Sequence, residues 1–64
     1  MGLSYISVDA EGAQFEWRLE RGGSLFMRPM GNQRWRFIER DIFGTTEARK
    51  YIKQTQGHKE VYSG

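Results

Sequence analysis

The segment Gln14–Glu20 alternates strictly between apolar and charged residues, and this pattern limits the possible folds more than any other feature of the sequence. The apolar positions are Phe15, Trp17 and Leu19. The charged positions are Glu16, Arg18 and Glu20. A period of two places these sets on opposite faces of a β-strand, with the apolar face in a core.

Three further segments, residues 3–8, 24–28 and 34–39, are rich in strand-forming residues and predict additional strands. The pair Gly22-Gly23 predicts a tight hairpin, because both residues tolerate a positive φ. Pro29 lacks the N–H that a central strand uses. We therefore expect the third strand to stop at Arg28, followed by a connection over residues 29–33 that turns at Gly31 and Asn32.

After Gly44 the hydrophobic period changes to that of a helix. The residues at helical spacing are Ala48, Tyr51, Ile52 and Thr55. Thr45 is the expected N-cap, since its hydroxyl can accept a hydrogen bond from a free backbone N–H. Gly57 is placed to end the helix near Gln56 in a left-handed conformation. Residues 58–64 are expected to form a flexible tail, although Val61 and Tyr62 could dock.

The sequence thus predicts an α+β fold: an antiparallel meander of three or four strands, with one carboxyl-terminal α-helix packed on one face. We expect one small domain over residues 1–57, because 64 residues allow only a thin core. The chain contains no cysteine, which excludes disulfides and thiolate metal sites. We expect large aromatic residues to supply the buried area that stabilises the domain in place of disulfides or a metal.

The face of the sheet opposite the helix is the candidate binding surface. If the apolar positions 15, 17, 19, 35 and 37 face the helix, parity places four arginines and one aromatic residue on the other side. These are Arg18, Arg28, Arg34, Arg36 and Phe26. Arginine binds phosphates and guanine edges, and an exposed phenylalanine can stack on an unpaired base. Alternatively, Glu16 and Glu20 pair with these arginines across strands, which leaves a solvated and self-neutralised face. A protein-binding face is the third possibility.

The second half of the chain, Arg34-Trp-Arg-Phe-Ile38 followed by Phe43-Gly-Thr-Thr-Glu-Ala-Arg-Lys-Tyr-Ile52, resembles the last strand and helix of plant ethylene-response-factor DNA-binding domains. That family, like the amino-terminal domain of some integrases, places a three-stranded sheet in the DNA major groove. The resemblance implies that the four arginines contact DNA. Two features differ: the first strand here carries glutamates, and the segment before the helix is longer.

Other charged residues give no catalytic motif. His58 is the only histidine and falls in the expected tail, a poor position for a general base. Glu39 and Asp41 could form a carboxylate pair, but further metal ligands at suitable spacing are missing. The basic residues near the helix end, Arg49, Lys50 and Lys53, are typical of cations that complement a helix dipole. We therefore expect no enzymatic activity, no cofactor and no metal site.

Net charge is +2, which is mildly basic, and no apolar run approaches the length of a membrane span. We expect a cytoplasmic, non-catalytic binding module whose partner is nucleic acid, with DNA favoured over RNA. The alternative is a small phage-type protein that binds and inhibits or modulates a host protein complex. A third reading is a subunit that dimerises through an edge at the third or first strand. A monomer or a weak homodimer fits these hypotheses.

Overall fold

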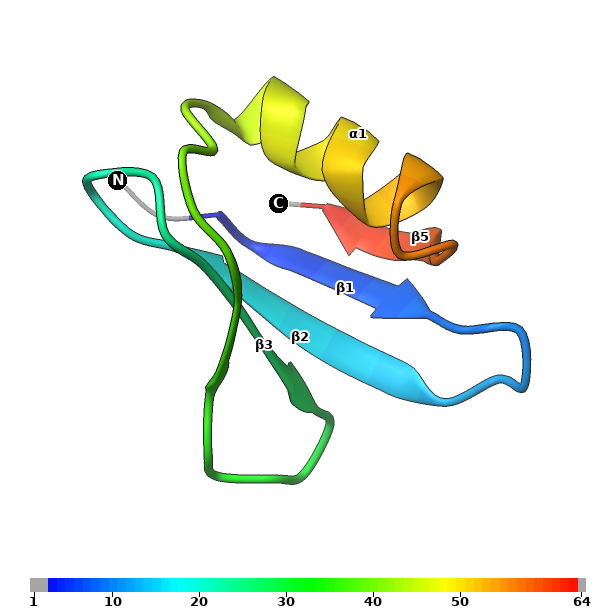
Figure 1. The fold of residues 1–64 in the computed structure, drawn as a ribbon. Helices are drawn as coiled ribbons and strands as arrows, with labels where there is room; N and C mark the ends of the chain where they lie inside the picture. The colour runs from blue at the N-terminus through cyan, green and yellow to red at the C-terminus, as the bar shows by residue number, and fades with distance from the viewer. Residues whose placement is uncertain (1–2, 64) are drawn as a thin grey trace.

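The computed structural model describes residues 3–63 and contains one antiparallel sheet and one helix (Figure 1). The elements in chain order are β1 (Tyr5–Val8), β2 (Gln14–Leu19), β3 (Leu25–Pro29), β4 (Arg36–Glu39), α1 (Thr45–Gln54) and β5 (Lys59–Ser63). The strand order across the sheet is β4-β3-β2-β1-β5, and every neighbouring pair is antiparallel. The predicted α+β fold, a meander with one helix packed against it, is confirmed.

The fifth strand corrects the expectation of a flexible tail over residues 58–64. β5 pairs with β1 along most of its length, from Tyr5 opposite Ser63 to Val8 opposite Lys59. Helix α1 also holds this strand, because Arg49 donates a hydrogen bond to the Ser63 hydroxyl and Lys53 pairs with Glu60 at 3.6 Å. The helix is therefore not the last element, and the domain extends at least to residue 63.

The position of β5 also corrects the expected dimerisation edges. β1 lies between β2 and β5, and β3 lies between β2 and β4, so each has a hydrogen-bonded neighbour on both sides. Within the described residues, only β4 and β5 present a free strand edge.

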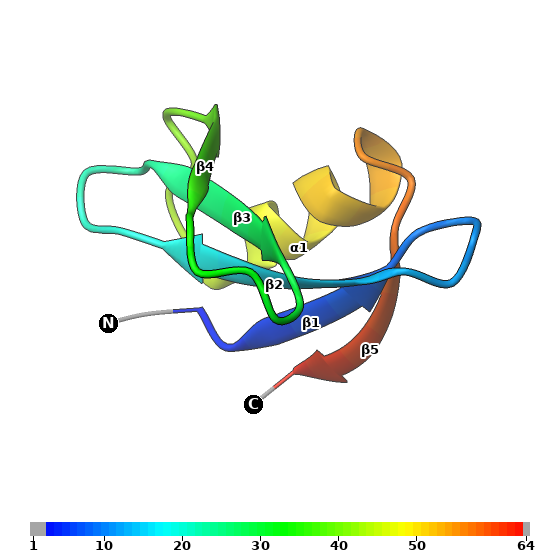
Figure 2. The same ribbon diagram turned by 90° about the horizontal axis from the view of Figure 1, so that it is seen from below.

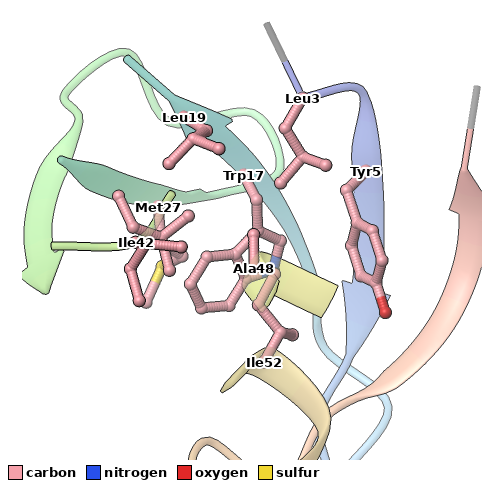
Figure 3. Packing of buried hydrophobic residues seen from close by; sticks show 9 residues of the cluster. Leu3, Tyr5, Trp17, Leu19, Met27, Ile42, Ala48 and Ile52 are labelled. Atoms are coloured by element: carbon pink, nitrogen blue, oxygen red, sulfur yellow. The ribbon is translucent and has the colours of Figure 1, made fainter. Parts of the chain in front are cut away.

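The core lies between the sheet and α1, where the inward residues of β1, β2 and β3 meet the helix (Figure 3). The buried apolar residues are Leu3, Tyr5, Trp17, Leu19, Leu25, Met27, Ile42, Ala48 and Ile52. In β2 and β3 the inward set is the one that the alternation predicts. Leu25, Ala48 and Ile52 are fully buried, and they fix the helix against the centre of the sheet.

The hairpin between β2 and β3 forms as predicted. Gly22 and Gly23 both have positive φ, and the Gly23 N–H donates to the Glu20 carbonyl at 3.1 Å. The next strand runs one residue further than expected, because Pro29 pairs with Phe15 as the last residue of β3. A proline at a strand end removes no ladder hydrogen bond from the strand's interior.

The start of α1 differs from the predicted cap. Gly44 is the N-cap with φ 123°, and Thr45 is already helical, so its hydroxyl is one position too late to cap. Glu47 instead accepts a hydrogen bond from the Phe43 N–H at 3.2 Å. The helix ends at Gln54, two residues before the expected end, and Gly57 has the predicted positive φ of 71°. No helix within residues 3–63 has the length and apolar character needed to cross a bilayer.

Candidate binding site on the open sheet face

We use the name open face for the side of the sheet opposite α1, which Figure 2 views with the helix behind the strands. Residues directly opposite each other in an antiparallel pair share a face. The register therefore gives three rows across the open face, one of which is Lys59, Val8 and Gln14. The first row is Tyr62, Ile6, Glu16 and Arg28. The second row is Arg18, Phe26 and Phe37.

Two of the four predicted arginines, Arg18 and Arg28, lie on the open face, and each is held by a carboxylate. Arg28 donates through Nε to Glu16 at 2.7 Å, across the β2–β3 pair. Arg18 lies 2.8 Å from a carboxylate oxygen of Glu20. The carboxylates lower the positive potential that these arginines present to a phosphate. The alternative of cross-strand pairs between these glutamates and the arginines holds for Glu16 and Arg28 alone, since Arg18 and Glu20 belong to the same segment of the chain.

The same two guanidinium groups lie against the ring of Trp35. The guanidinium carbon of Arg28 is 4.3 Å from the ring centroid, and that of Arg18 is 5.7 Å away. Cation–π contacts of this kind contribute about 0.5–1 kcal/mol at exposed sites. A partly exposed tryptophan is thereby held over the β2 and β3 strands.

The expectation that Trp35 and Phe37 face the helix is wrong. Phe37 pairs with Phe26, is 56% exposed, and its ring packs edge-on at 5.8 Å between centroids. The pairing of Phe26 with Phe37 and of Met27 with Arg36 sets this face, and the register shift between Leu25 and Phe26 then brings Glu39 opposite Leu25. β4 also begins only at Arg36, so Trp35 precedes the strand and is free to turn onto the open face.

This reversal moves the other two predicted arginines away from the open face. Arg36 pairs with Met27 and therefore points to the helix side of the sheet, at the β4 edge, where it is exposed. Arg34 is exposed in the connection before β4, and its backbone N–H bonds to the Asn32 side chain at 2.9 Å. Among the described residues, neither arginine takes part in an ion pair. Arg34 lies beside Trp35 in the chain.

Tyr62 is a site residue that sequence reasoning did not find. Its position opposite Ile6 places it on the open face, and it is 55% exposed. The only sequence signal for β5 is a short run with Val61 and Tyr62, which is too brief for a periodicity argument. The contact of this strand with β1 decides its orientation.

A shallow groove of about 260 Å³ lies over β1 and β2 near the start of β1, where Leu3 and Ser4 also line it. The residues of the open face that line it are Ile6, Glu16, Arg18, Trp35 and Tyr62. Trp35 comes from the β4 side and Tyr62 from β5, so one aromatic ring lies toward each flank. The floor combines an aliphatic side chain with one carboxylate and one guanidinium.

A separate polar cluster lies on the helix side of the sheet. Ser7, which is fully buried, accepts a hydrogen bond from the Trp17 indole N–H at 2.7 Å, and His58 Nδ1 lies 2.7 Å from the same hydroxyl oxygen. The imidazole also packs on Phe15, with ring centroids 4.8 Å apart. Burial lowers the pKa of His58 below its ordinary value of 6.5, against the opposing influence of Asp9. These contacts give His58 a structural role beside the core.

Within the described residues no group of three or more His, Cys, Asp or Glu side chains could hold a metal ion. The carboxylate pair considered from the sequence, Glu39 and Asp41, acquires no third ligand there. The sequence matches no protein-family model, and comparisons with curated proteins and with solved structures find no similar protein.

Proposed function

We propose that this chain is a small binding module that takes nucleic acid on the open face. The observation that carries the proposal is Trp35, held over Arg18 and Arg28 beside a groove whose opposite flank is Tyr62. Aromatic rings and guanidinium planes on an exposed sheet are the groups on which bases stack.

The rim of the open face supplies the cations that a phosphate backbone requires. Arg34 is exposed just before Trp35 in the chain and forms no ion pair with any described residue. Lys59 pairs with Val8 in the sheet, which directs its side chain to the open face at the β5 edge. Phosphate contacts of this kind give an affinity that falls with salt.

An amide NMR titration with a DNA duplex and a DNA single strand, at about 50 and 200 mM salt, tests the proposal. We expect shifts on β1, β2 and the Arg34–Phe37 segment that weaken at the higher salt, while the exposed side of α1 stays unchanged. Shifts confined to α1, or no shifts with either DNA, would contradict binding on the open face.

A protein partner is the second candidate, and the ion pairs Arg28–Glu16 and Arg18–Glu20 favour it. A face of tryptophan, tyrosine and neutralised arginine has the composition of a protein–protein hot spot. The substitution Glu16→Gln separates the two candidates. It removes a negative charge and frees Arg28, so affinity for nucleic acid should rise, whereas the complementary potential of a protein interface would be lost and its affinity should fall.

A further inference from the structure

We infer that the open face selects unpaired strands over duplex, with bases in the groove between Trp35 and Tyr62 and phosphates at its rim. This inference rests on the proposed function and deepens it, because it names the form of nucleic acid. Reading of a duplex by a sheet needs free arginines that reach base edges in the major groove. Here the arginines of the sheet surface, Arg18 and Arg28, are bound to carboxylates at 2.8 and 2.7 Å.

The charge distribution across the groove points the same way. Glu16 and Arg18 form the polar floor, and Glu16 is paired with Arg28 at 2.7 Å, so the centre of the face offers no excess positive charge to a phosphate. Two cations without an ion pair among the described residues lie outside this floor: Arg34 in the connection before β4, and Lys59 opposite Val8 on β5. A single strand can place its bases on the aromatic rings of the groove and its phosphates near the unpaired cations. A duplex keeps its bases paired inside and presents phosphates to the groove, where no unpaired cation of residues 3–63 lies.

The aromatic groups are arranged for stacking. Trp35 and Tyr62 come from opposite sides of the groove, and Phe37 extends the aromatic surface toward β4 with 56% of its surface exposed. Arg28 is 4.3 Å from the Trp35 centroid and therefore holds the indole in place before a base arrives. A ring that is already ordered loses little side-chain entropy on binding.

Fluorescence anisotropy with a labelled mixed-sequence strand of about 15 nucleotides, its duplex, and the RNA strand tests the inference. We expect the single strands to bind more tightly than the duplex. Trp35→Leu and Tyr62→Leu should each weaken single-strand binding by about 5- to 150-fold, the range for loss of one stacked base. The salt dependence should be shallow, with a slope near −1.4 for about two phosphate contacts.

Phe43→Leu is the matched control, because Phe43 is also a large exposed aromatic residue, at 67%, but lies next to Gly23 and the start of α1. We expect this variant to bind as the parent does. Tyr62→Leu keeps the test valid if Trp35→Leu misfolds, because Tyr62 is exposed and its substitution leaves the Trp35–Arg28 contact intact. A circular dichroism spectrum of each variant verifies the fold.

The outcomes separate the inference from the proposed function. Equal or tighter binding of the duplex overturns single-strand selection, and an equal loss in the Phe43 control overturns the groove between Trp35 and Tyr62 as the site; nucleic-acid binding stands in either case. Absence of binding to all three probes overturns both, and the protein partner then becomes the leading candidate. Tighter single-strand binding that depends on Trp35 and Tyr62 supports the inference.

Discussion

The buried hydroxyl of Ser7 links β1 to both Trp17 and His58, and its removal should destabilise the whole domain. The Trp17 indole N–H donates to the Ser7 oxygen, so the single serine proton is available for His58 Nδ1. In Ser7→Ala both contacts disappear. The indole N–H then lies beside a methyl group in a position where the tryptophan is only 2% exposed.

The expected cost follows from these contacts. A buried donor without a partner costs about 1–3 kcal/mol, whereas an ordinary intramolecular hydrogen bond contributes about 0.5–1.5 kcal/mol. We expect a loss of about 2 kcal/mol in the free energy of unfolding. For a domain of this size the corresponding decrease in Tm is about 8–16 °C.

Urea denaturation followed by tryptophan fluorescence measures this loss. Ser4→Ala is the control, because Ser4 is exposed just before the same strand, and its change should stay within about 0.5 kcal/mol. Trp17→Phe alone and combined with Ser7→Ala completes a double-mutant cycle, with an expected coupling of about 1 kcal/mol. If Ser7→Ala is no more destabilising than Ser4→Ala, the hydroxyl does not hold the indole, and the reasoning fails.

Three other predictions concern the fold. Gly23→Ala should destabilise the domain by about 1–3 kcal/mol more than Gly12→Ala. Both glycines have φ near +90°, but only at Gly23 would the new Cβ lie 2.9 Å from Phe43. Thermal denaturation of the two variants gives the difference. Tyr5→Phe should leave the free energy of unfolding unchanged or raise it by up to about 1 kcal/mol in urea denaturation. The reason is that the Tyr5 hydroxyl is buried without a hydrogen bond to any described residue. A clear loss of stability would show that the hydroxyl has a partner. Burial lowers the pKa of His58 in the folded state, so the unfolded chain binds more protons near pH 6.5. The free energy of unfolding should therefore be highest above that pH and fall as the pH drops below it. Urea denaturation between about pH 5.5 and 8 measures this dependence, which should be missing in His58→Gln.

Local sequence patterns were sufficient to predict the strand β2 and the hairpin that follows it. The alternation over Gln14–Glu20 predicts both the strand β2 and its buried face, because a period of two leaves only the choice of which face is apolar. The pair Gly22-Gly23 predicts the following hairpin, since the turn requires positive φ. The same alternation predicts that Arg18 in β2, and Phe26 and Arg28 in β3, point to the open face, as the pairing of the two strands shows.

The remaining features depend on contacts between segments that lie far apart in the chain. The face of β4 was decided by its pairing with β3, which places Phe37 opposite Phe26 on the open face and Arg36 opposite Met27 on the other side. The alternation of β4 is compatible with either face, so no local pattern records this choice. The strand β5 exists because β1 offers a free edge and α1 supplies partners for Ser63 and Glu60. The sequence by itself determined which segments are amphipathic, since that is a local property; only the tertiary structure decided which aromatic residues meet the arginines, because register and strand pairing are properties of the whole sheet.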